Sequence, residues 1–176
     1  MNTSLMIGIL GAVMLIIGLL WKDKKGINHP TQSTKNWLLG VGAFIMLIYS
    51  IMGYLSGTGA IFFIFLQSLV VLSSVLMMLN VPDKTASLMI IIVGIILLIW
   101  SVALFENFGL LFFIAGLVGI GLGFVLKKPM SRNIGFGLGG ALIALFSYIG
   151  ANWVFFWLNV FFGLISGYFV IKEIKK

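Results

Sequence analysis

The polar side chains that could do chemistry in this chain are few, and the two most suggestive are amides. Gln67 and Asn159 each stand inside a long apolar run, and each closes an aromatic-leucine-amide triplet that begins at Phe65 or Trp157. An amide offers both donors and acceptors without net charge, so at mid-depth of a membrane it can bond a sugar hydroxyl or a carboxamide. Phe65 and Trp157 could add flat faces for a ring. Residues two apart do not share a helix face, so each aromatic and its amide would flank a cavity at an angle.

A second interpretation of the same amides is open. They could bond across helices as packing contacts, which are worth about 0.6 kcal/mol on average. Tyr49 and Tyr148 are further binding candidates, although they lie one residue out of register with each other. Ser50 and Ser147 match in register, but serine commonly bonds the backbone of its own helix.

The interiors of the apolar runs contain no Lys, Arg, Asp or His. Such residues mark proton relays and ion pathways in membranes, so a proton-coupled pump is disfavoured. The chain has no cysteine, no carboxylate pair and no metal-ligand cluster, so we expect neither an enzyme nor a bound metal or cofactor. Glu106, the one acid between the fourth and fifth runs, is either a gate or a solvated turn residue.

The elements that would position these residues are apolar runs. The chain is 61% hydrophobic and 9% charged, with a mean hydropathy of +1.22. Soluble domains carry about 25% charged residues, so most of this chain has lipid as its solvent. Backbone groups in lipid must bond internally, which predicts helices. We therefore expect an all-α membrane protein with seven transmembrane helices, at residues 5–21, 37–55, 60–79, 88–105, 110–126, 134–149 and 153–171.

The basic residues predict how the chain is oriented. All eleven fall in alternate gaps or after the last run, and the other gaps contain none. Because Lys and Arg stay on the cytoplasmic side, we expect a multi-pass protein of the plasma (inner) membrane with its N-terminus outside and its C-terminus inside. The net charge of +7 then indicates contact with lipid headgroups and no nucleic-acid partner. The residues are Lys22, Lys24, Lys25, Lys35, Lys84, Lys127, Lys128, Arg132, Lys172, Lys175 and Lys176.

An internal repeat organises the seven runs. Residues 5–79 can be laid on residues 110–171, with 88–105 as a linker helix inside a single membrane domain, 1–176. Three helices are an odd number, so the linker would invert the chain and give two halves that run the same way. The pairs are Gly11/Gly116, Gly18/Gly123, Lys22/Lys127, Lys35/Arg132, Asn36/Asn133, Gly40/Gly137, Gly42/Gly139, Ser50/Ser147, Gln67/Asn159 and Ser74/Ser166.

This 3+1+3 pattern resembles the SWEET, SemiSWEET and PnuC group of small-solute transporters. The resemblance implies a central cavity faced by the amides and aromatics of each third helix, here Phe65, Gln67, Trp157 and Asn159. The chain departs from SWEET proteins in its prolines, because all three lie in loops. Glycine-rich runs could bend in their place, or could simply pack tightly as small residues do between membrane helices.

We therefore expect a facilitative transporter of a small neutral organic solute, such as a sugar or a nucleoside-like vitamin, that works by alternating access between two halves. The alternative is a non-transporting membrane protein that acts through helix partners, as an accessory subunit, immunity or stress protein would. An ion channel is a weaker third choice, since the runs show no ring of charge. Assembly into a homo-oligomer is left open.

Overall fold

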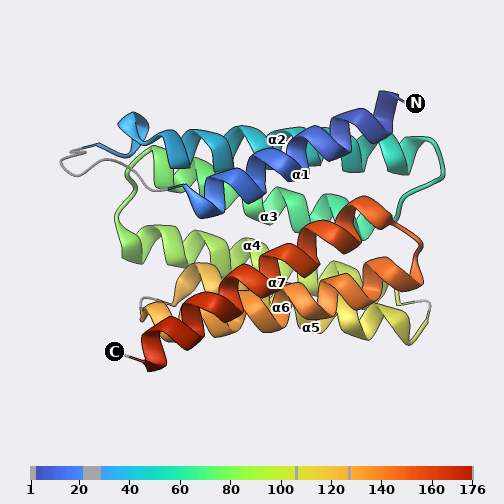
Figure 1. Ribbon diagram of the computed structural model, residues 1–176. Coiled ribbons are helices and arrows are strands. Elements are labelled where there is room, and N and C mark those ends of the chain that lie inside the picture. The colour runs from blue at the N-terminus through green and yellow to red at the C-terminus, as the bar shows by residue number, and fades with distance from the viewer. Residues whose placement is uncertain (1–2, 22–28, 106, 127, 176) are drawn as a thin grey trace. The chain divides into compact units, whose positions relative to one another are not determined.

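The computed structural model describes residues 3–21, 29–105, 107–126 and 128–175, and this part of the chain is all-helical. Seven α-helices and one short 3-10 turn, η1, form it, which confirms the expected all-α fold (Figure 1). Their bounds are α1 Thr3–Leu20, η1 Pro30–Gln32, α2 Thr34–Leu55, α3 Ile61–Met78, α4 Asp83–Ala103, α5 Gly109–Val125, α6 Pro129–Ile149 and α7 Trp153–Ile174.

Six of these described helices are long and apolar enough to cross a membrane. The exception is α5, which is equally apolar but has 17 residues, at the lower limit of what can span the hydrocarbon core. The helices begin where local chemistry favours it. Pro129 occupies the first turn of α6, where its missing N–H costs nothing, so this helix starts earlier than the apolar run predicts. Ser33 and Asn152 cap α2 and α7, and their side-chain oxygens accept bonds from Asn36 N (3.0 Å) and Phe155 N (3.3 Å).

The chain divides into two compact units, Met1–Ala86 and Ser87–Lys176. In the first unit α2 packs against both α1 and α3, and in the second unit α6 packs against both α5 and α7. Consecutive helices in each unit run in opposite directions, as short connections require (Figure 1). The boundary between the units falls within α4, near the start of the segment expected to link the halves.

Glycines set the closest helix approaches inside each unit. A Cβ atom placed on Gly42 of α2 would lie 3.0 Å from the Leu15 nitrogen of α1. A Cβ placed on Gly139 of α6 would lie 2.6 Å from the Ile120 nitrogen of α5. Only residues without a side chain let backbones approach this closely. Because lipid supplies no hydrophobic driving force between helices, this close packing is what stabilises the helix pairs. Two further close contacts recur in both units, Gly11 on Met46 as Gly116 on Ile143, and Gly18 on Leu39 as Gly123 on Phe136. Gly40 and Gly137 also face matched serines, Ser74 and Ser166, at ordinary van der Waals distance.

The end of α6 carries a residue in a left-handed backbone conformation. Ala151 has φ +52°, and the N–H of Asn152 donates to Ser147 O at 2.9 Å across this turn. The equivalent position after α2 is a glycine, Gly57, with φ +71°. A side chain in this conformation costs about 1–2 kcal/mol, which glycine avoids.

We therefore expect Ala151→Gly to raise the free energy of unfolding by about 1 kcal/mol, because the strain at the cap is relieved. Thermal or denaturant unfolding of the purified protein in mild detergent measures the change. The matched control is Ala115→Gly on the exposed face of α5, which should lower stability by about 1 kcal/mol as glycine does inside helices. Equal changes at the two positions would contradict a strained cap at Ala151.

Candidate functional site

The amide of Gln67 is buried and incompletely bonded. Gln67 lies in α3, is 3% exposed, and its Oε1 has no hydrogen-bond partner among the described residues. It stands six residues after the start of α3, about 9 Å along the helix. Among the six helices that are long and apolar enough to cross a membrane, α3 is also the most buried, with 50% of its residues inside the fold. An acceptor buried without a partner is costly, so Gln67 is the described residue whose chemistry most needs an explanation.

Asn159 occupies the matching place in α7. It is 6% exposed and lies six residues after the start of its helix, also about 9 Å along. Its Nδ2 donates to the Phe155 carbonyl oxygen at 2.8 Å, within the same helix. This bond is neither a contact with a solute nor the contact between helices that the sequence left open. The two amides are therefore alike in depth and burial but differ in what they bond.

The two aromatic candidates differ more strongly. Phe65 is buried, and its ring lies edge-on to Phe62 at 6.1 Å between centroids. Trp157 is 54% exposed and contacts the rings of Phe156 (5.0 Å) and Phe161 (6.3 Å). A half-exposed indole among other rings is typical of a side chain that faces lipid or headgroups. The two triplets thus place their amides alike and their aromatics differently.

Each of the two tyrosine candidates packs against a neighbouring helix. Tyr49 is half-buried in α2 and covers Gly8 of α1, because a Cβ on that glycine would lie 2.9 Å from the tyrosine ring. Tyr148 is 58% exposed near the end of α6 and packs on Trp153 at 5.8 Å between ring centroids. Glu106 lies outside the described residues, so its role as a gate stays a prediction.

The register-matched serines bond their own helices. Ser50 Oγ donates to Met46 O at 2.8 Å, and Ser147 Oγ donates to Ile143 O at 2.7 Å. Both serines are buried, so their hydroxyls are satisfied without a solute.

A groove in the second unit is the feature that sequence reasoning missed. It runs between α6 and α7, has a volume of about 750 Å³, and is lined almost wholly by carbon. We call it the α6–α7 groove. Small residues at a spacing of three and four along α6 are the sequence pattern that could have predicted this groove, since they leave room between helices. It is lined by Asn133, Ile134, Gly137, Leu138, Ala141, Ala144, Leu145, Phe156, Asn159, Val160, Gly163, Leu164, Gly167, Val170 and Ile171.

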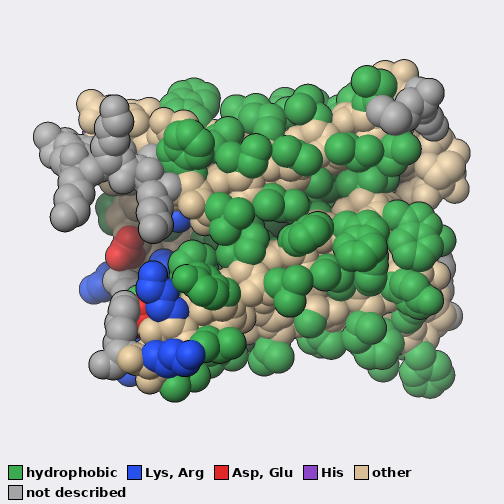
Figure 2. Space-filling view, in the orientation of Figure 1, with side chains coloured by type: hydrophobic (Ala, Val, Ile, Leu, Met, Phe, Trp, Pro, Cys, Tyr) green, Lys and Arg blue, Asp and Glu red, His purple; other side chains and the backbone are tan. Residues whose placement is uncertain are grey.

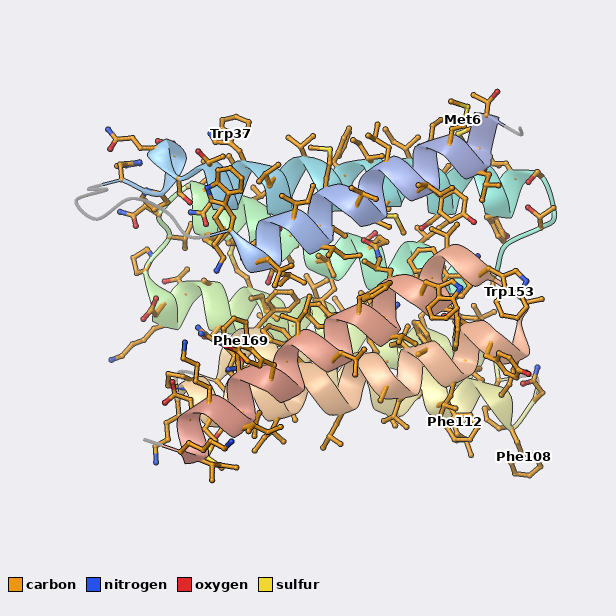
Figure 3. All side chains as sticks on the ribbon, viewed as in Figure 1. Met6, Trp37, Phe108, Phe112, Trp153 and Phe169 are labelled. Carbon is orange, nitrogen blue, oxygen red and sulfur yellow. The ribbon has the colours of Figure 1, made fainter. Side chains whose placement is uncertain are left out.

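Charge in the second unit gathers at one end of the helices. Lys128 and Arg132 lie at the start of α6, and Lys172 and Lys175 lie at the end of α7, which is the same end because the two helices are antiparallel. Figure 2 shows Lys and Arg side chains at this end beside an apolar flank. Figure 3 shows Phe108 and Trp153 at the opposite end of the same unit and Phe169 toward the charged one. The described residues contain no group of three or more His, Cys, Asp or Glu that could hold a metal ion.

The described fold is that of an all-helical protein, and its several long apolar helices indicate that it is embedded in a membrane. No protein-family model, no curated protein and no solved structure matches this chain.

Proposed function

We propose that this protein is a membrane transporter that moves a small neutral organic solute down its gradient. The observation that carries the proposal is the buried Oε1 of Gln67, which has no partner among the described residues. Leaving such an acceptor unpaired costs about 1–3 kcal/mol, and a hydroxyl or N–H of a passing solute would satisfy it. An uncharged amide suits an uncharged solute, because burying a charge would require a compensating one.

We infer an internal repeat, and with it a second half-site at Asn159. The glycine contacts described above recur at matched positions: Gly42 meets Leu15 as Gly139 meets Ile120. Gln67 and Asn159 then lie at the same depth on the third helix of each half. We propose that the two units are the halves of one repeat joined by α4, and that transport works by alternating access, as in the SWEET and PnuC group.

We also propose that the basic residues face the cytoplasm, with the N-terminus outside. The chain contains no cysteine, so single cysteines can report this orientation without background. Cysteines replacing Thr58 and Asn107, both exposed in connections without Lys or Arg, should react with an impermeant maleimide added outside intact cells. Cysteines replacing Thr31 and Lys175 should react only after the membrane is permeabilised. The reverse pattern, or labelling of all four from outside, would contradict the orientation.

The transport proposal is tested with purified protein in liposomes. Uptake of a panel of radiolabelled sugars and nucleosides is measured with no ion gradient. We expect saturable uptake of at least one solute that stops when inside and outside concentrations are equal. Uptake at the level of protein-free liposomes for the whole panel would count against transport of these solutes.

A second function is favoured by the bonding of Asn159 and the exposure of Trp157. An amide bonded to its own helix and an indole on the surface are compatible with a non-transporting protein that works through helix partners. The two functions differ at Gln67, since an accessory role would need no solute there. Cross-linking in native membranes distinguishes them: a stoichiometric protein partner together with absent uptake would favour the accessory role.

A further inference from the structure

The α6–α7 groove has the length of one membrane leaflet. On α6 its lining extends from Asn133 to Leu145, which is about 18 Å at 1.5 Å per residue. One leaflet contributes about 15 Å of the hydrocarbon core. The rims of the groove, Leu138 and Leu164, are exposed, so the groove opens on the side of the helices. An elongated apolar guest could therefore enter from the bilayer.

The groove has a basic end. Its lining reaches Asn133 on α6 and Ile171 on α7. Arg132 directly precedes Asn133, and Lys172 directly follows Ile171. Lys128 and Lys175 lie at the same end, and Glu173 is the one described acid of this segment, so positive charge prevails (Figure 2). Basic residues at the inner edge of membrane helices attract anionic headgroups.

We propose that the α6–α7 groove binds one acyl chain of an anionic phospholipid, with the lipid phosphate held by Arg132 and Lys172. The apolar lining accepts the chain, and the two cations at its end accept the headgroup. A second copy of this protein is a poorer occupant. Inserted in the same direction, it would bring its own basic end beside this one, and like charges repel.

The lipid site is independent of the proposed transport, and lipid binding can be measured without any solute flux. The two nevertheless meet at Asn159, which lines the groove while only 6% exposed. A chain that fills the groove covers this amide. Bound lipid and a solute at Asn159 should therefore exclude each other.

Native mass spectrometry of the full chain in mild detergent tests the site. Phosphatidylglycerol and phosphatidylcholine with identical acyl chains are added separately. We expect one phosphatidylglycerol retained per chain, with an affinity at least about tenfold above that of phosphatidylcholine. The double variant Arg132→Gln, Lys172→Gln should bind phosphatidylglycerol about 30-fold more weakly, the factor expected for two basic residues near the membrane surface. Ala141→Phe, which fills the groove, should weaken both lipids.

The matched control removes two charges from the first unit, whereas the groove lies in the second. Lys35→Gln with Lys84→Gln should change phosphatidylglycerol affinity less than about threefold, although the net charge falls equally. Three results would overturn the proposal: equal retention of the two lipids, equal losses in the two double variants, or lipid-free dimers that Ala141→Phe dissociates. The charge variants lie at helix ends, so they keep the test valid if Ala141→Phe does not fold.

Discussion

Gly139→Ala is expected to lower the free energy of unfolding by about 3 kcal/mol. A Cβ at this position would lie 2.6 Å from the Ile120 nitrogen and 2.8 Å from the Gly116 oxygen, which are both backbone atoms. Backbone cannot rotate away as a flexible side chain can, so α5 and α6 would have to move apart. Overpacking of this kind costs typically 1–3 kcal/mol, and the upper value applies where no side chain can yield. Unfolding in mild detergent, followed by circular dichroism, measures the loss.

Two glycines calibrate this expectation. Nothing lies within 4 Å of a Cβ on Gly167 of α7, so Gly167→Ala should raise stability by up to about 1 kcal/mol through helix propensity. The stability of Gly42→Ala should lie between those of Gly139→Ala and Gly167→Ala, because the nearest backbone atom to a Cβ on Gly42 is at 3.0 Å. If Gly139→Ala were as stable as the native chain, the close approach of α5 and α6 would be wrong.

Gln67→Leu is expected to raise the free energy of unfolding by about 2 kcal/mol. Leucine has a similar volume and has no acceptor to leave unpaired, whereas the native Oε1 is buried without a partner among the described residues. A residue that destabilises its own fold is typical of a functional site, because selection there acts on function. Thermal unfolding without added solute measures the gain.

Asn159→Leu is the matched substitution in the second unit. The native amide donates to Phe155 O at 2.8 Å, so its replacement removes a satisfied bond. Such bonds in membrane helices are worth about 0.6 kcal/mol, and we expect a loss of that order. Opposite signs at Gln67 and Asn159 are therefore expected. A loss of stability in Gln67→Leu would mean that this amide is a packing contact instead.

Hydropathy alone predicted the helices, because backbone N–H and C=O groups in lipid must form hydrogen bonds within their own segment. It could not place the start of α6, where Pro129 and the polar turn that follows extend the helix beyond the apolar run. It did give the length of α5, whose 17 residues lie at the margin for spanning. Helix ends depend on capping and proline chemistry, which an average over a window does not register.

The burial of the two candidate amides was predicted from the sequence. Spacing placed Gln67 and Asn159 at one depth on two helices, and their burial agrees with an interior position. Residue spacing could not predict that Phe65 is buried while Trp157 is exposed. The helical period gives the direction in which a side chain points, but it does not say what packs against that side chain. The α6–α7 groove was not predicted from the sequence for a related reason. It is formed by the space beside small residues such as Ala141.

Solute uptake by Gln67→Leu in liposomes decides whether the buried amide of Gln67 binds the solute. Native protein and Ala151→Gly, a variant stabilised away from the amides, are measured beside it with the solute that gives uptake. We predict that native protein and Ala151→Gly transport alike, and that Gln67→Leu loses about tenfold or more, the factor for one hydrogen bond to a solute. Undiminished uptake by a folded Gln67→Leu would contradict a solute contact at Gln67.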